Sequence, residues 1–278
     1  MESDLRTAAI TDDASLPAIP ARKRLTLVER EAQILAGAIA FFSVHGLDGQ
    51  MRVLANEIGV THALLYHYFP TKQALIDRVY YELFEGRWKP EWEDLLDDPD
   101  LDVEEKFTAF YCDYATTVLT REFVRIFMFS GLSDHYITDR FFTLLRTRLF
   151  PRLVRETRRY CGTVSRKQPS VQEFELVMGL HGGIFYTGVR QYIYGQAGHA
   201  TSQAAYDAAT IRDRVRSYLL SAGVVLASMT RKKAVSTAKT ATTGTPGSAA
   251  TTRIKPAARV AAPARRASAP LKRPPEGR

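Results

Sequence analysis

A group of polar side chains between residues 52 and 72 has the chemistry to contact nucleic acid. Hydroxyl, imidazole and ammonium groups donate hydrogen bonds to phosphate oxygens, and Thr61, Tyr66, His67 and Lys72 supply them here. Arg52 adds a guanidinium, which can make two parallel hydrogen bonds to a guanine edge. Each group could instead be an ordinary exposed side chain, so its role depends on the elements that position it.

Two short helices are predicted around these residues. The first covers residues 50–58, with an apolar face made of Met51, Leu54, Ala55 and Ile58. Gly59 can end it in a left-handed conformation, and Thr61 can cap a second helix over residues 62–69. Two short helices joined by a brief turn containing Gly form a helix-turn-helix, whose second helix enters the major groove of DNA. His62 and Ala63 begin that second helix, so we expect them to face base edges.

Amphipathic helices are predicted on both sides of this unit. The preceding one has an apolar stripe of Leu27, Ile34, Leu35, Ala38, Ile39 and Phe42. The following one is capped by Thr71, runs to about Trp88, and has Leu75, Val79 and Leu83 on one face. Three generic helices without a DNA role would require both the spacing of the breaks and the Tyr-His-Tyr-Phe run to be coincidental.

From Leu25 to about Trp88 the chain resembles the DNA-binding domain of the tetracycline-repressor (TetR) family. The matching pieces, in order, are Phe41-Phe42, His45-Gly46-Leu47, Leu54-Ala55, Gly59-Val60-Thr61, Leu65-Tyr66-His67-Tyr68-Phe69 and Thr71-Lys72-Gln73-Ala74-Leu75. The resemblance implies that Arg52 reads a base. It also implies that phosphates are held by Thr61, Tyr66, His67 and Lys72.

The chain departs from the family pattern at three places. The family usually has Thr or Ser as the cap before the first of the two helices, and this chain has Asp48-Gly49 there. Its recognition helix begins His62-Ala63 where relatives often have Lys-Gly, and Leu64 replaces a residue that is often polar. The fold is not threatened, but the operator sequence cannot be transferred from a relative.

Composition indicates a globular, cytoplasmic protein. The 278 residues suffice for one large or two small domains, and 45% are hydrophobic. The first 24 residues lack the apolar core of a secretory signal, and no apolar run predicts a membrane span. Cys112 and Cys161 lack metal-site spacing and fit packing roles in a reducing compartment.

The net charge of +8 is concentrated in one segment. Residues 231–278 contain 12 Lys or Arg and one acid, whereas residues 1–230 contain 26 Lys or Arg and 29 acids. The segment is rich in Ala, Thr and Pro without hydrophobic periodicity, so we expect disorder. It either raises non-specific DNA affinity or is only a solubilising extension. Residues 1–24 are also expected to be disordered, and Arg22-Lys23-Arg24 could touch DNA as an arm.

Residues 89–230 are predicted to form a second, helical domain. Pro90 and Pro99 among acids indicate a linker over 89–100. Five helical stripes follow, beginning at Phe107, Phe123, Phe141, Phe174 and Ile211, and Pro151 should kink the third. Resemblance implies a homodimer through the last two long helices. Two recognition helices related by a twofold axis would then read a palindrome with half-sites about 34–36 Å apart.

The resemblance also implies a small-molecule pocket in this second domain. Candidate lining residues are Phe110, Tyr114, Phe127, Phe142, Met178, His181, Phe185 and Tyr192, although an aromatic stripe is more often plain core. His181 could bind a ligand, pair across a dimer or, the reading we favour, donate to a backbone carbonyl. The spacing of His135, His181 and His199 predicts no metal site.

These inferences give an all-α protein of about nine helices. Its expected domains are residues 1–24, 25–88, 89–230 and 231–278. The expected function is a sequence-specific, DNA-binding transcriptional regulator, a repressor released from a palindromic operator by a largely apolar effector. The alternative is an architectural DNA-binding protein that uses its basic tail. No nucleophile–base set, phosphate-binding Gly loop or pair of acids on a helix face indicates an enzyme, and no cofactor is expected.

Overall fold

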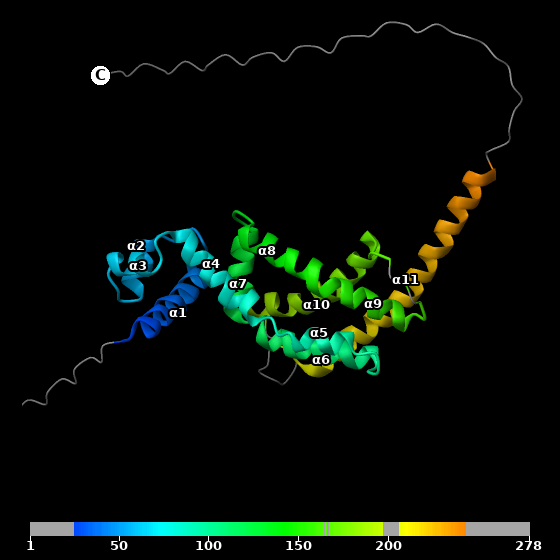
Figure 1. Ribbon diagram of the computed structural model, residues 1–278, viewed down its shortest axis with the longest axis horizontal. Helices are drawn as coiled ribbons and strands as arrows, with labels where there is room; N and C mark the ends of the chain where they lie inside the picture. Colours follow the sequence, from blue (N-terminus) through cyan, green and yellow to red (C-terminus); the bar gives the residue numbers. More distant parts are fainter. Residues whose placement is uncertain (1–24, 164, 166, 197–205, 243–278) are drawn as a thin grey trace, which may run out of the picture. The chain divides into compact units, whose positions relative to one another are not determined.

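The computed structural model describes residues 25–163, 165, 167–196 and 206–242, with side chains in the last helix described to Ser228. All regular elements in these ranges are helical, which confirms the all-α class (Figure 1). Eleven α-helices are present there instead of about nine. One additional helix forms in the predicted linker, and one predicted helix is divided in two. The expected arm at residues 1–24 lies outside the described ranges.

Four helices form the N-terminal module: α1 (Leu27–His45), α2 (Met51–Glu57), α3 (His62–Tyr68) and α4 (Lys72–Leu83). Thr26 caps α1, accepting from the Glu29 amide while the Glu29 carboxylate accepts from the Thr26 amide. Helix α4 ends at Leu83, earlier than expected, and a 3-10 turn over Glu85–Arg87 follows. In this turn Gly86 lies against the Tyr81 carbonyl, where an added Cβ would come within 2.8 Å, so a larger residue would not fit without a shift.

The predicted linker over residues 89–100 is wrong, because residues Glu91–Asp97 form helix α5. Pro90 precedes it with φ −55°, an angle already suited to a helix start. Trp92 and Leu96, four residues apart, are buried against the rest of the protein. The indole of Trp92 also donates to Asp113 Oδ2 at 2.8 Å. Three of the acids that suggested a linker, Glu91, Glu93 and Asp94, occupy the first turn of this helix, where its dipole favours negative charge.

The next helices are α6 (Val103–Thr117), α7 (Arg121–Gly131), α8 (Tyr136–Leu144) and α9 (Phe150–Tyr160). A π-helical turn over Leu145–Leu149 separates α8 from α9, and Pro151 lies in the first turn of α9. Proline has no amide hydrogen, and its ring would clash with the carbonyl four residues earlier. The π-helical turn accommodates the proline because its hydrogen bonds join residues five apart and not four apart. Pro151 therefore interrupts the predicted helix by a change of helix type.

The last two helices are α10 (Val171–Tyr192) and α11 (Ala208–Thr242). Ser170 and Glu173 form a capping box at the start of α10. Helix α11 runs beyond residue 230, so the expectation of disorder is wrong for residues 231–242, which contain the good helix formers Ala, Lys and Arg. Residues 243–278 lie outside the described ranges. The chain divides into two compact units, Met1–Thr230 and Arg231–Arg278.

Helices α5, α6 and α9 meet at a buried ion pair. The Lys106 ammonium lies 2.7 Å from Glu156 Oε2 and 3.2 Å from the Leu96 carbonyl oxygen. The Lys106 side chain is fully buried and that of Glu156 is 6% exposed. Glu156 also accepts from the Arg159 side chain, at 2.9 Å. The carboxylate therefore has two further cations beside it, because the Arg155 guanidinium also lies 3.5 Å from Oε1. Among the described residues, the ammonium has only the neutral Leu96 carbonyl besides Glu156.

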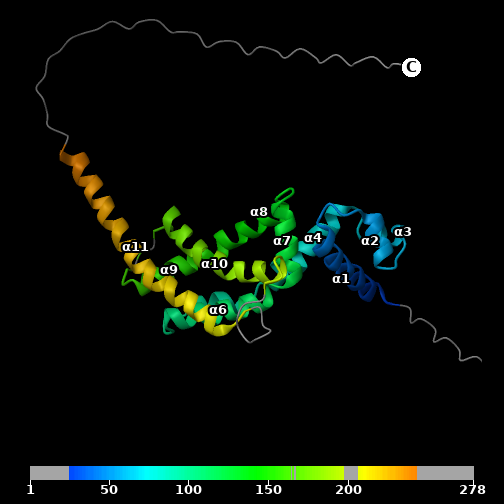
Figure 2. The same cartoon turned by 180° about the vertical axis from the view of Figure 1, so that it is seen from behind.

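Two arginines join the N-terminal module to the later helices. Arg140 of α8 contacts α4: its guanidinium lies 3.2 Å from Asp77 Oδ1 and 3.9 Å from the centre of the Tyr80 ring. Arg125 of α7 donates to the Ser43 carbonyl near the end of α1 and, at 3.4 Å, to the Tyr192 carbonyl at the end of α10. Figures 1 and 2 show α7 beside α1 from opposite sides. The helix-turn-helix module is thus attached through both α1 and α4.

Candidate nucleic-acid interface

The turn between α2 and α3 has the geometry that the sequence predicts. Gly59 adopts φ +69°, and its amide donates to the Asn56 carbonyl at 3.2 Å. Nothing lies within 4 Å of the position that a Cβ would take there, so glycine is needed for the backbone angle and not for space. The Thr61 hydroxyl accepts from the Leu64 amide at 3.1 Å and begins α3. The turn and the cap together fix the direction in which the recognition helix leaves α2.

Helix α3 is held by one face and exposed on the other. Leu65 is fully buried and Phe69, which ends the helix, is 5% exposed. Thr71 then caps α4, accepting from the Ala74 amide at 3.0 Å. The candidates for DNA contact lie outside the core. Lys72 is half-buried, and the exposed candidates are Arg52, Thr61, His62, Ala63, Tyr66 and His67. The packing leaves all of them accessible to a partner.

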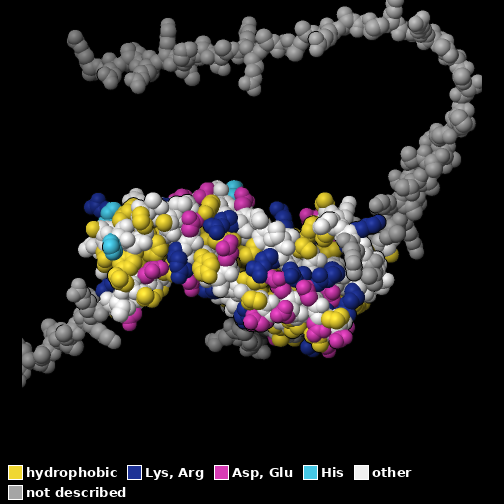
Figure 3. All heavy atoms as spheres, viewed as in Figure 1, with side chains coloured by type: hydrophobic (Ala, Val, Ile, Leu, Met, Phe, Trp, Pro, Cys, Tyr) yellow, Lys and Arg dark blue, Asp and Glu magenta, His cyan; other side chains and the backbone are white. Residues whose placement is uncertain are grey.

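Two of these residues support each other on the surface of α3. The rings of His62 and Tyr66, one helical turn apart, lie edge to face with centres 4.7 Å apart. Tyr66 is 37% exposed, so its hydroxyl remains available. In Figure 3 the end of the molecule that contains α2 and α3 shows histidine and hydrophobic side chains and little Lys or Arg. This surface offers hydrogen bonds and ring faces more than positive charge.

The candidate pocket residues fall into two aromatic groups. In the first, the Tyr114 ring lies 5.4 Å from both the Phe110 and His181 rings, measured between centres. In the second, the Phe127 ring lies 5.8 Å from Phe142 and 5.3 Å from Phe185. Met178 and Tyr192 are half-buried at the edge of the core. The rings of Tyr111 and Phe150, which were not among the candidates, also lie against His181.

The first group contains buried polar atoms without a hydrogen-bond partner among the described residues. These atoms are His181 Nδ1 and the hydroxyls of Tyr111 and Tyr114. The favoured expectation that His181 bonds a backbone carbonyl is therefore wrong for Nδ1. Burial lowers the pKa of His181 to about 4 and raises the pKa of Tyr114 well above its usual range. The group is polar but uncharged at neutral pH.

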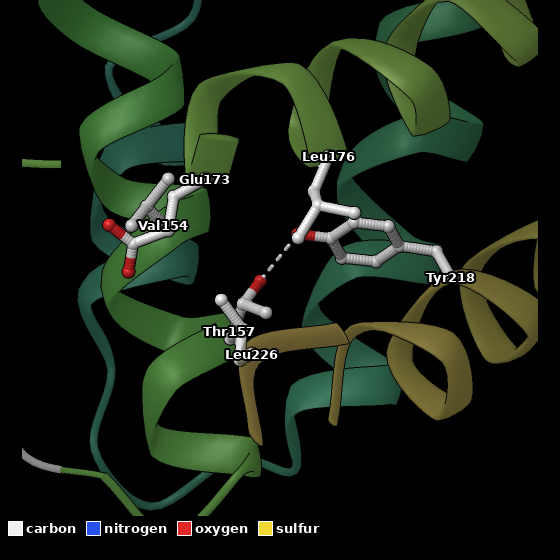
Figure 4. Close-up of a pocket in the computed structure, with 6 residues that line it drawn as sticks. All are labelled: Val154, Thr157, Glu173, Leu176, Tyr218 and Leu226. Carbon is white, nitrogen blue, oxygen red and sulfur yellow. Dashed lines mark hydrogen bonds between the residues drawn. The ribbon is translucent and has the colours of Figure 1, made fainter. Parts of the chain in front are cut away.

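Two hollows among the described residues lie away from these candidates. One small cavity between α9, α10 and α11 is lined by Val154, Thr157, Glu173, Leu176, Tyr218 and Leu226 (Figure 4). The hydroxyls of Thr157 and Tyr218 are 2.8 Å apart across it. The second is an open groove beside α8 and the π turn, lined by charged and hydroxyl groups that include Arg140 and Arg148. Neither hollow contains a residue proposed for the pocket.

The buried imidazole predicts a pH dependence of stability. The pKa of His181 is about 4 in the folded protein and near 6.5 when unfolded, so only the unfolded chain gains this proton between those values. The contribution of this site to the free energy of unfolding is complete above pH 6.5 and is lost as the pH falls to 4. At 1.36 kcal/mol per pKa unit, the loss is about 3 kcal/mol. Urea unfolding should show this decline between pH 6.5 and 4. The His181→Phe variant should lack the part of this decline that comes from the imidazole. If the variant and the original protein lose stability identically between pH 6.5 and 4, the prediction is contradicted.

The described part of the chain shows no cluster of three or more His, Cys, Asp or Glu residues that could bind a metal. Within the same residues, no helix combines the length and the apolar character needed to cross a membrane.

The chain is similar to known regulatory proteins. Residues 34–79 match the family model described as bacterial regulatory proteins, tetR family. No curated protein matches the chain. A TetR-like transcriptional regulator from Rhodococcus sp. RHA1 is 18% identical, with a TM-score of 0.52 over 71% of this chain and 97% of that one.

Two further solved structures have the same fold. A putative transcriptional regulator from Pseudomonas aeruginosa PAO1 is 15% identical, with a TM-score of 0.54 over 72% of this chain and 93% of that one. The fatty acid degradation regulator FadR from Bacillus halodurans is 17% identical, with a TM-score of 0.51 over 71% of this chain and 97% of that one. At such identities the likeness concerns the fold alone.

Proposed function

We propose that this chain is a repressor released from a palindromic operator by a small effector. The proposal starts from the match of residues 34–79 to the family model of bacterial regulatory proteins, tetR family. The observation that carries the proposal is the presentation of α3. Its buried face is anchored by Leu65, its first turn is capped by Thr61, and its outer face is exposed. Such a rigid, projecting helix is what major-groove reading requires.

The roles of individual residues follow from their positions. His62 and Ala63 begin α3, where a recognition helix approaches base edges, and exposed Arg52 adds a donor pair suited to guanine. The hydroxyl of Thr61 accepts its capping hydrogen bond and can still donate to a phosphate. Phosphate contacts are also assigned to Tyr66, His67 and Lys72. These contacts set the register of the helix on the duplex, and the base contacts set the sequence.

The outer faces of α10 and α11 support a homodimer. Leu220 and Val224, one turn apart on α11, are 61% and 73% exposed. On α10, Gly179 and Gly182 have no atom of the described residues within 4 Å of their Cβ positions, and Tyr186 is 51% exposed. Apolar side chains beside glycines permit close helix packing against a second copy. A twofold dimer would place two α3 helices for a palindrome.

Effector binding is assigned to the aromatic core between α6, α7, α8 and α10. Its polar atoms are neutral at physiological pH, so they suit a largely apolar, uncharged molecule with one hydrogen-bonding group. The signal would pass to the DNA-binding module through α4, which Arg140 of α8 contacts, and through α1, which Arg125 of α7 contacts. The coupling required is about 1–3 kcal/mol. The protein would act at the nucleoid in the cytoplasm.

Selection of genomic fragments by the purified protein tests this proposal. We expect enrichment of a short palindrome whose half-sites are about one helical turn apart. The matched control is Thr61→Ala together with His62→Ala, which removes the cap and one reading residue and should abolish the motif. Enrichment without any motif would contradict a specific repressor and favour the architectural alternative.

A further inference from the structure

The outer face of α3 has an apolar centre. Three side chains on the opposite side of the helix are buried or half-buried, namely Leu64, Leu65 and Tyr68. Residues three and four apart lie on one side of a helix, so the exposed Tyr66 and His67 lie on either side of the direction in which Ala63 points. Ala63 is itself exposed. The middle of this face therefore presents a methyl group to a partner.

Ring contacts favour the polar side chains of α3 remaining on its two flanks. On one flank the Tyr66 ring lies edge to face with the His62 ring, with centres 4.7 Å apart. On the other the His67 ring lies edge to face with the Tyr68 ring, with centres 5.4 Å apart. From these flanks Tyr66 and His67 can reach the phosphates that border a groove. The position between them, which faces the floor of the groove, belongs to Ala63.

A methyl side chain selects among bases by apolar contact. It forms no hydrogen bond, so a base donor or acceptor pressed against it would lose water and gain no partner. The 5-methyl of thymine is the apolar group that the bases present in the major groove. We infer that Ala63 selects a T·A base pair at one position of each half-site through contact with this methyl group. The inference rests on the proposed function, since it requires α3 in the major groove, and adds the identity of the base.

Removal of single methyl groups from the selected operator tests the inference. Uracil, which pairs with adenine as thymine does, replaces thymine at one position at a time, symmetrically in both half-sites. Burial of one methyl group corresponds to about fourfold in affinity, so its loss from both half-sites should weaken binding by the full-length protein about fifteenfold. The Ala63→Gly variant lacks the partner methyl group. The same replacement should therefore weaken its binding by less than about twofold.

Two further variants separate the lost contact from a damaged helix. Ala36→Gly is the matched control, because it makes the same change at an exposed helical position of α1 in the same module. Its binding should keep the full, about fifteenfold, dependence on the thymine methyl. Ala63→Ser costs a helix less than glycine does and places a hydroxyl against the methyl group. This variant should also bind the thymine and uracil operators within about twofold of each other.

The outcomes distinguish this inference from the repressor proposal. If a palindrome is selected but uracil weakens binding by less than about twofold at every position, the inference is overturned and the repressor proposal stands. The same holds if Ala63→Gly keeps the full dependence on the methyl group, because another side chain then contacts the thymine. If no motif is enriched at all, both are contradicted, since Ala63 then selects no base.

Discussion

Replacing Glu156 with leucine will destabilise the protein by about 3–5 kcal/mol, because it leaves the Lys106 ammonium buried without a counterion. The Lys106 side chain is fully buried, and the Leu96 carbonyl, 3.2 Å away, would be its remaining polar neighbour. For a protein of this size, such a loss corresponds to a fall in Tm of about 6–20 °C. Urea unfolding and thermal melting at pH 7 measure both quantities.

The two ends of this ion pair should behave differently. Lys106→Met leaves Glu156 with the Arg159 guanidinium at 2.9 Å, so its cost should be clearly smaller than that of Glu156→Leu. The double variant removes both buried charges and should recover most of the stability lost in Glu156→Leu. Equal losses in the two single variants, or a double variant whose loss is the sum of the two, would contradict the contacts that we describe.

Arg52→Ala will weaken binding to the selected operator by at least about thirtyfold. A bidentate contact to guanine contributes about 1–3 kcal/mol to discrimination, and a twofold dimer makes it twice. Arg52 is exposed and has no ion pair among the described residues, so its removal should change the free energy of unfolding by less than about 0.5 kcal/mol. Operator affinity and urea unfolding are measured on the same preparations.

Lys72→Ala provides the comparison for this prediction. A phosphate contact carries no sequence information, so this variant should lose affinity similarly for operator and random DNA. Arg52→Ala should weaken operator binding much more than random-sequence binding and relax the preference at one base pair of each half-site. If both variants weaken all DNA equally, Arg52 holds a phosphate and does not read a base.

The N-terminal module was predictable because its signals are local. Gly59 ends α2, and Thr61 and Thr71 cap the next two helices, as their residue types indicate. Each of these effects depends on residues within one helical turn, so a single sequence contains all the information needed. The exposed candidates on α3 followed directly, since Leu65 and Phe69 define which face is buried.

The later helices were less predictable where packing overrode composition. Pro90 and its acidic neighbours were interpreted as a linker, although the same residues make a good helix start once Trp92 has a core to enter. Lys106 is a charged residue, and nothing near it in sequence indicates that Glu156, fifty positions later, would neutralise it in the core. Contacts of this range depend on the tertiary arrangement.

The effector site has the same difficulty. Helical spacing identified Tyr114 and His181 as inward-facing, and the structure places both among buried rings. It did not reveal that Tyr111 and Phe150 would complete that group, because helix rotation and neighbour choice are set by packing between elements distant in sequence. The two aromatic groups therefore became distinguishable only in three dimensions.

Arg125 has a mechanical consequence. A guanidinium is planar and its N–H directions are fixed, so the two carbonyls that it serves, those of Ser43 and Tyr192, are held at a set separation and angle. The ends of α1 and α10 are therefore connected through a single planar group. If one end shifts, the other must follow or one of these two hydrogen bonds must break.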